Sequence, residues 1–324
     1  MPRTVAPARR HTARSRRLRI TAAFAVLVAV GGYLTVQYVT GGTSSDQCTV
    51  RSADGSSGEG RTYRMTFEQA ANAATISAVG TTRGMPERAV TIALATALQE
   101  SGLRNIQHGD RDSLGLFQQR PSQGWGTEKQ ILDPVYSAGK FYQHLAEVPG
   151  YSRLPLTVAA QRVQRSGFPQ AYAKHEPDAA LLAAALTGRT PAALNCEPPR
   201  STAVSGGTSK VRAALVRSFG KDVLPAGTGA DAGAAGATAA GADAGAAGAT
   251  AAGALSVPVE SVRRTGEDDA PQRGWELAHW AVAQSETLGI DEVAYAGRVW
   301  SPDSGWRTER ERSHTAEVRI GLVR

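Results

Sequence analysis

Residues 97–118, ALQESGLRNIQHGDRDSLGLFQ, hold the most specific pattern in this chain of 324 residues. Apolar side chains at 89–98 cover most of the circumference of a helix, which predicts a helix at the centre of a core. Glu100 stands at the end of that helix, and a Gly-Leu-Phe-Gln turn begins fifteen positions later at Gly115. The stretch therefore predicts one carboxyl group held beside a glycine turn.

Boundary signals extend the helical pattern over residues 65–196. Thr66 and Gln69 have the spacing of a capping box, and Pro86 suits the first turn of the central helix. No strand of any length is expected in this region. Further helices are expected at 133–147, 155–165, 168–174 and 177–187.

The composition changes after residue 196. Residues 197–258 are rich in Pro, Gly, Ser and Ala and contain a perfect duplication, GADAGAAGATAA, at 229–240 and 241–252. Such a tract has little to bury and is expected to be a disordered linker. An alanine-rich helix is the alternative, but each glycine costs a helix about 1 kcal/mol. Residues 259–324 mix helical and strand patterns, which predicts a small α+β domain.

The first 40 residues predict a membrane anchor. Residues 1–19 carry seven arginines and no acidic residue, and residues 20–40 carry no charge. A helix of about 20 residues spans the hydrocarbon layer of a bilayer, and the arginines before it stay on the cytoplasmic side. The alternative is a secretory signal that is cleaved. Either route exports the rest of the chain, with residues 41–64 as a Gly/Ser/Thr-rich tether.

The net charge of +7 comes from the same first 40 residues. Seven arginines in the first 40 residues account for it, so the other 284 residues are near neutral. This distribution is a topology signal for a membrane and does not predict a basic surface that binds nucleic acid.

The two cysteines, Cys48 and Cys196, lie 148 positions apart near the two ends of the helical region. In an oxidising compartment they are expected to form one disulfide, which is worth about 4–5 kcal/mol in the chain-entropy account. The alternative is two unrelated thiols. Two such distant cysteines without convergent histidines do not predict a zinc site.

A Glu-Ser pair at 100–101 and a Gly-Leu-Phe-Gln turn at 115–118 resemble lysozyme-like lytic transglycosylases, whose helix ends in Glu-Ser before a Gly-Leu-Met-Gln turn. The phrases GDRDSLGLFQQRPSQGWGT at 109–127 and AAQRVQRSGFPQAYAKHEP at 159–177 resemble a domain of exported proteins from high-GC actinobacteria. The resemblance covers residues 45–196. It implies a lysozyme-like helical fold that cleaves the glycan strands of bacterial peptidoglycan.

Breaking a glycosidic bond requires a proton donor that stays neutral near pH 7, and apolar surroundings keep a carboxyl group in that state. Glu100 fits this role, and the resemblance makes it the catalytic acid. A glutamate at a helix end is otherwise usually a solvated residue. Substrate contacts are expected from the turn and nearby segments: Ser101, Gly115, Leu116, Phe117, Gln118, Gln119, Trp125 and Gln164.

Two of these contacts have alternatives. Trp125 either covers a sugar ring with its indole face or anchors a loop to the core. Gln164 lies in the sequence VQRSG at 163–167, where the family carries a Tyr-Asn-Ala-Gly signature. Either Gln164 takes the place of the family's asparagine, or the site is altered or inactive.

A second carboxylate is the usual partner of the acid in a glycosidase. Lytic transglycosylases instead use the C6 hydroxyl of the substrate's N-acetylmuramic acid, which gives a 1,6-anhydro product. Asp110 and Asp112 are candidates for a hydrolytic variant, but aspartates in a sequence such as HGDRDS are typical of turns and caps.

Residues 259–324 resemble a small module that follows cell-wall hydrolase domains in the same bacteria. The Arg-Val-Trp at 298–300 matches it, whereas the last strand reads Ala-Glu-Val-Arg at 316–319 and lacks the metal-binding histidines. His279 and His314 alone form no ligand set. No metal, cofactor or catalysis is expected here, and the expected role is binding to the wall or to an envelope protein.

Two functions are consistent with the sequence. The first is a membrane-anchored, exported enzyme that cleaves peptidoglycan by lytic transglycosylase or muramidase chemistry, with Glu100 as its single acid. The second is a non-catalytic peptidoglycan-binding or scaffold protein of the cell envelope, favoured by the changed segment at 163–167. Glycan strands and a lipid bilayer are the expected partners, and nucleic acid is not.

Overall fold

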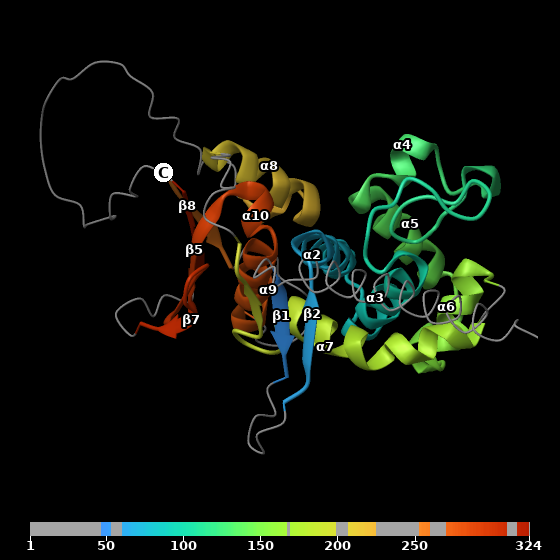
Figure 1. Cartoon of the computed structure of the whole chain (residues 1–324), viewed down its shortest axis with the longest axis horizontal. Coiled ribbons are helices and arrows are strands. Elements are labelled where there is room, and N and C mark those ends of the chain that lie inside the picture. The colour runs from blue at the N-terminus through green and yellow to red at the C-terminus, as the bar shows by residue number, and fades with distance from the viewer. Residues whose placement is uncertain are drawn as a thin grey trace, which may run out of the picture. The chain divides into compact units, whose positions relative to one another are not determined.

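The computed structural model describes residues 47–52, 60–166, 169–198, 207–224, 253–259, 270–309 and 316–323. These residues form nine α-helices and two small sheets (Figure 1). The prediction of a mainly helical chain with a smaller α+β part is confirmed at this level. The predicted membrane helix at 20–40 lies outside the described residues, and no helix within them is long and apolar enough to cross a bilayer.

The central helix predicted from the apolar run is α3 (Glu87–Ser101). Every residue from Ala89 to Leu98 is buried, as expected of a helix that is apolar nearly all round. Gly102 ends the helix with a φ of 62°, a left-handed conformation in which glycine meets no side-chain penalty. Glu100 consequently lies in the last turn of a firmly packed helix.

Helix α2 (Phe67–Thr82) begins at the predicted capping box. Thr66 and Gln69 exchange hydrogen bonds between side chain and backbone at 2.8 and 3.3 Å. The Gln69 amide also donates to the carbonyl of Gly102 at 2.7 Å. The start of α2 is thereby fastened to the end of α3.

The helices between residues 134 and 186 pack against α3, and those predicted from the sequence lie within a few residues of their expected boundaries. Asp133 caps one of them by accepting from the backbone N–H of Val135 at 2.9 Å. The predicted helix at 168–174 is a 3-10 helix. The elements are η2 (Pro121–Gln123), α4 (Glu128–Ile131), α5 (Pro134–Ala146), η3 (Tyr151–Arg153), α6 (Leu156–Gln164), η4 (Pro169–His175) and α7 (Glu176–Leu186).

A three-stranded sheet accompanies these helices, although the sequence predicts none. β1 (Cys48–Arg51) pairs antiparallel with β2 (Thr62–Met65) on one side and β3 (Leu194–Cys196) on the other. The prediction of a tether over 41–64 is therefore wrong for both β1 and β2. Strands of three or four residues carry too little alternation to be recognised, and the β1–β3 pairing joins distant parts of the chain.

The predicted disulfide between Cys48 and Cys196 is present. The two residues face each other in the β1–β3 register, and both are fully buried. The bridge therefore joins the first strand of the helical region to its last strand.

The predicted disordered linker, 197–258, contains regular elements near both of its ends. α8 (Gly207–Phe219) buries an apolar face against α2, and β4 (Ala254–Pro258) belongs to the second sheet. The prediction is wrong for these residues, because the apolar side chains of this region find partners elsewhere in the chain. The duplicated repeat at 229–252 lies outside the described residues.

The second sheet has five antiparallel strands in the order β4-β8-β5-β6-β7. Its central hairpin turns at Ala296 and Gly297, whose φ angles are 48° and 73°. The mixture of helix and strand predicted for 259–324 is confirmed by its described residues. The elements are η6 (Lys221–Val223), α9 (Ala270–Ala283), α10 (Ser285–Leu288), β5 (Ile290–Tyr295), β6 (Arg298–Ser301), β7 (Gly305–Thr308) and β8 (Glu317–Leu322).

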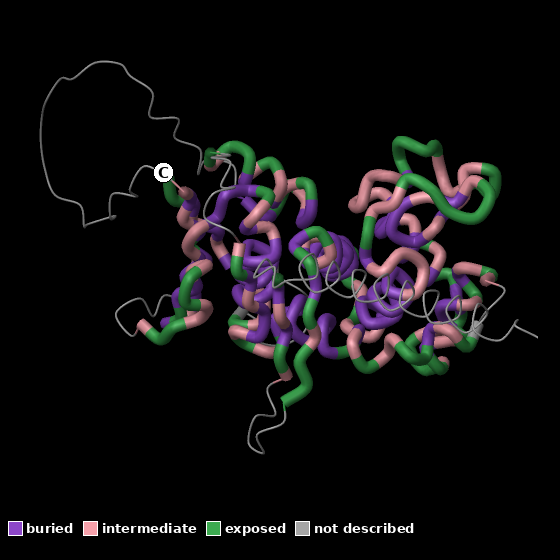
Figure 2. The backbone as a smooth tube through the Cα atoms, viewed as in Figure 1, coloured by how far each residue is buried: buried purple, intermediate pink, exposed green. Residues whose placement is uncertain are grey.

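Helix α9 packs against the second sheet and also against α2, α7 and β3, so buried residues of both regions form one hydrophobic cluster (Figure 2). Trp300 Nε1 donates to Asn195 Oδ1 at 2.9 Å. Trp306 Nε1 donates to the carbonyl of Leu194 at 2.8 Å. The sequence predicts a separate domain at 259–324, whereas helix α9 of this region completes the core of the helical region.

Candidate active site

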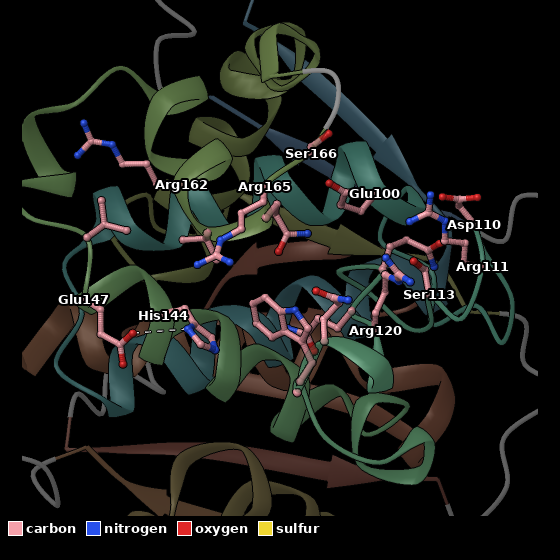
Figure 3. Close-up of a pocket in the computed structure, with 18 residues that line it drawn as sticks. Glu100, Asp110, Arg111, Ser113, Arg120, His144, Glu147, Arg162, Arg165 and Ser166 are labelled. Carbon is pink, nitrogen blue, oxygen red and sulfur yellow. Dashed lines mark ion pairs between the residues drawn. The ribbon is translucent and has the colours of Figure 1, made fainter.

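A cleft with a volume of about 780 Å³ opens beside the end of α3 (Figure 3). Its lining comes from the last turn of α3, the loop after it, the end of α5 and the end of α6. The volume lies in the range typical of ligand-binding sites. Five of the predicted site residues lie together in the lining: Glu100, Gln118, Gln119, Trp125 and Gln164.

Glu100 is half-buried in the wall of this cleft. Burial raises the pKa of its carboxyl group, because the loss of water penalises the charged form. Hydrogen bonds from Tyr172 and Gln164 lower the same pKa, but the effect of burial is larger. The carboxyl group is therefore biased toward the protonated form that a proton donor needs.

Tyr172, in η4, contacts Glu100 and is not identified by the sequence analysis. Its phenol donates to Glu100 Oε1 at 2.6 Å. Burial raises the pKa of Tyr172, and the neighbouring Glu100 raises it further, so the phenol remains a donor. The Tyr172 side chain is fully buried and is not part of the cleft lining, so it contacts Glu100 from the core. A lone tyrosine in a short 3-10 helix has no spacing pattern that would reveal this role.

Gln164 connects the acid to the glycine turn. It lies in the last turn of α6, and its amide donates to the carbonyl of Phe117 at 2.7 Å. The same side chain hydrogen-bonds Glu100 and lowers its pKa. The glutamine of the changed VQRSG segment therefore lies directly beside the acid.

The glycine turn requires glycine at its first position. Gly115 has a φ of 73°, and a Cβ there would lie 2.8 Å from the carbonyl oxygen of Ile131. Both the backbone conformation and the lack of space exclude a larger residue. Ser101 Oγ donates to the carbonyl of Leu116 at 2.8 Å and ties the turn to α3.

Four of the predicted substrate contacts lie outside the cleft lining: Ser101, Gly115, Leu116 and Phe117. Leu116 and Phe117 are fully buried, and Phe117 stacks on Phe141 with 4.7 Å between ring centroids. Their side chains are enclosed by the core, so contact of these two residues with a ligand would require their backbone atoms. Leu116 and Phe117 anchor the turn in the core, and the turn thereby fixes the position of the residues next to it.

Gln118, the last residue of this turn, and Gln119, which follows it, differ in their exposure to the cleft. Gln118 has a left-handed φ of 48°, and its amide lies 3.4 Å from the carbonyl oxygens of His108 and Gly115. Gln119 is buried and donates to the carbonyl of Ser137 at 3.0 Å. Gln118 is thus the more accessible of the two polar groups.

Trp125 is partly exposed and lines the cleft. Its ring lies 4.5 Å from that of His144, measured between centroids. Its carbonyl accepts from the Tyr136 hydroxyl at 3.2 Å. The backbone of Trp125 is therefore anchored while part of its indole is exposed. The role of a loop anchor and the role of a surface for a sugar ring are both compatible with this position.

The two aspartates differ in their surroundings. Asp112 accepts from the backbone N–H of Ser122 at 2.8 Å and from Arg120 Nε at 2.7 Å. These bonds hold the pKa of the Asp112 carboxyl well below its usual range. This is the turn role expected of an aspartate, and Asp112 is not among the lining residues. Asp110 is exposed and does line the cleft.

Within the described residues, no group of three or more His, Cys, Asp or Glu side chains is placed to hold a metal ion. His279 is fully buried, with Nδ1 2.7 Å from the carbonyl oxygen of Ala185 and Nε2 accepting from the N–H of Ala193 at 3.2 Å. Burial lowers the pKa of His279 to about 4. It is a structural contact between α9 and the helical region, and His314 lies outside the described residues.

A family model described as VldE, C-terminal domain, matches residues 202–318. The match runs from before α8 into β8 and contains no residue of the cleft. It is less than half of the chain and therefore describes a similarity of the C-terminal part. No curated protein matches the chain.

Proposed function

We propose that this protein cleaves peptidoglycan glycan strands by lytic transglycosylase or muramidase chemistry, with Glu100 as its acid. The observation that carries the proposal is the position of Glu100. It lies half-buried in the wall of a cleft, and burial raises its pKa. The local resemblance of the Glu-Ser pair and the glycine turn adds support, since one residue of each motif, Glu100 and Gln118, lines the cleft.

In the proposed reaction, protonated Glu100 gives its proton to the glycosidic oxygen as the bond to the anomeric carbon breaks. The hydrogen bond from Tyr172 stabilises the carboxylate that remains. Glu100 then takes a proton from the attacking hydroxyl and returns to its starting form. Attack by the C6 hydroxyl of N-acetylmuramic acid gives a 1,6-anhydro end, and attack by water gives a reducing end.

Support for a saccharide as the ligand comes from the lining. The partly exposed indole of Trp125 offers an apolar face that suits a pyranose ring. The amides of Gln118 and Gln164 also belong to the lining. This combination of one aromatic face with several hydrogen-bonding groups is typical of ligand sites.

We also propose that the enzyme works outside the cytoplasmic membrane, anchored by residues 20–40. This part of the proposal rests on the sequence pattern of the first 40 residues. The Cys48–Cys196 disulfide supports it, because such bonds persist in oxidising compartments.

The test is to incubate the purified full-length chain with isolated sacculi and to separate the released fragments by mass. Glu100→Gln should lower release by about 10²–10⁴-fold, the usual contribution of a general acid. Glu128→Gln, an exposed glutamate of α4, is the matched control and should release at the wild-type rate. Release that survives Glu100→Gln would remove Glu100 from the mechanism. A wild-type chain that binds sacculi and releases nothing would support the non-catalytic binder instead.

A further inference from the structure

Two arginines lie on the same side of the cleft. Arg162 lies in the last turn of α6, and Arg165 is the residue that caps this helix. Both are exposed, and both line the cleft. Figure 3 shows them on one side of Glu100, with Asp110 on the other side.

Neither of these guanidinium groups has a hydrogen-bond or ion-pair partner among the residues that the structure describes. Two other charged groups of the lining, Arg120 and Glu147, do have partners. Arg120 pairs with Asp112 at 2.7 Å, and Glu147 lies 3.6 Å from His144. The charge of Arg162 and Arg165 is therefore not neutralised by a described side chain, and both residues belong to the cleft lining.

The backbone at Arg165 is unusual for a residue with a long side chain. Its φ is 52°, and its N–H donates to the carbonyl of Gln161 at 2.8 Å. Glycine is the common residue at such a helix end, because any side chain is strained there. Strained positions gather at functional sites, and Arg111 and Gln118, also left-handed, line the same cleft.

We infer that Arg162 and Arg165 form an anion subsite beside Glu100, which receives a carboxylate or phosphodiester group carried by the glycan strand. Guanidinium groups bind both anions through paired, charge-assisted hydrogen bonds. The lining as a whole has the right sign, with four arginines against two acidic residues besides Glu100. This inference rests on the proposed function, since it requires a strand in the cleft, and it names the chemistry that the strand must carry.

The test measures binding of four ligands by calorimetry to the full-length chain that carries Glu100→Gln, which prevents turnover. The ligands are a neutral N-acetylglucosamine tetramer, a peptide-bearing glycan tetramer with free carboxylates, the same tetramer with amidated carboxylates, and a glycan that carries a phosphodiester polymer. The double change Arg162→Gln with Arg165→Gln should weaken binding of an anionic ligand by about tenfold or more, as expected for losing charge-assisted bonds. Binding of the neutral tetramer should not change.

Arg153→Gln is the matched control, because Arg153 is exposed on η3 and is not in the lining. It should leave every dissociation constant unchanged. Preference for free over amidated carboxylates assigns the subsite to peptide stems, and preference for the phosphodiester ligand assigns it to an attached polymer. An unchanged ratio of anionic to neutral binding in the double variant would overturn the subsite and leave the glycan cleft standing. Failure of the parent chain to bind any of the four ligands would overturn both proposals.

Discussion

Tyr172 and Glu100 are joined by a 2.6 Å hydrogen bond between side chains that lie 72 positions apart in sequence. This bond favours the carboxylate form of Glu100, whereas burial of the same group favours the protonated form. The acid is therefore held between two opposing influences. The hydrogen bond comes from Tyr172, which lies in η4 and follows Glu100 by 72 positions. Burial follows from the place of Glu100 at the end of α3 and from the segments that pack against it.

Removing the phenol should shift this balance in a known direction. Because the hydrogen bond from Tyr172 lowers the pKa of Glu100, Tyr172→Phe should raise that pKa. Activity that needs the protonated acid falls as pH rises through this pKa, so the alkaline limb of kcat/KM should move to higher pH. The rate at the optimum should fall by about fivefold, the usual worth of one hydrogen bond.

The measurement is a pH profile of fragment release from sacculi. Tyr151→Phe is the control, since Tyr151 is half-buried and is not a lining residue. Its profile should match that of the wild-type chain. An alkaline limb that stays in place, or moves to lower pH, in Tyr172→Phe would show that the bond does not set the protonation of Glu100.

Asp110 is the acidic residue of the lining that the sequence offers as a second catalytic carboxylate. It is exposed, and its backbone carbonyl accepts from the N–H of Ser113 at 3.0 Å, which is a turn contact. Asp110→Asn should therefore keep the rate of release within about twofold of wild type, as surface substitutions usually do. A loss as large as that of Glu100→Gln, with reducing-end products, would instead make Asp110 the base of a hydrolytic reaction.

The parts of the fold that the sequence predicts are those with a local cause. The capping box of Thr66 and Gln69 needs residues only three positions apart, and it is present. The apolar run before Glu100 spans ten residues at 89–98, and all of them are buried. Local chemistry of this kind is written in a short stretch, so it can be read without knowing the rest of the chain.

The parts that the sequence misses depend on contacts between distant segments. β1 is four residues long and is defined by its pairing with β3, which lies at the other end of the helical region. Tyr172 acquires its role only when η4 folds against the end of α3. Phe117 is predicted to contact substrate because it belongs to the turn motif, but its ring stacks on Phe141 of α5 in the core. A motif locates a site, and packing decides which of its side chains face the ligand.

The shared core predicts that the helical region is unstable without the C-terminal part. A chain that ends after Pro198 lacks α9, so the buried faces of α2 and α7 that this helix covers become exposed. We expect a fragment of residues 46–198 to aggregate or to lose its cooperative thermal transition, whereas residues 46–324 keep it. Size-exclusion chromatography and calorimetry check this. A monomeric fragment that unfolds at the temperature of the longer chain would show that the core does not depend on α9.

His279 makes the stability of the same interface depend on pH. Its Nε2 accepts from the N–H of Ala193, so a proton cannot be added there without breaking this bond. Burial lowers the pKa of His279 to about 4 in the folded chain, while the unfolded chain has the ordinary value of about 6.5. Above about pH 6.5 both states are neutral here and stability is independent of this group. As pH falls from there to about 4, only the unfolded state gains the proton, so stability falls by about 3 kcal/mol.

Denaturant unfolding at about pH 7 and about pH 5 measures this effect for the full-length chain. His279→Gln should lower the free energy of unfolding at both values, because it disturbs the bonds to Ala185 and Ala193, but it should flatten the difference between them. His108→Gln is the control, since His108 is exposed, and it should keep the wild-type difference. If His279→Gln loses as much stability between the two pH values as wild type does, another group is responsible for the acid sensitivity. If wild type loses none, His279 is already protonated or solvated in the folded chain.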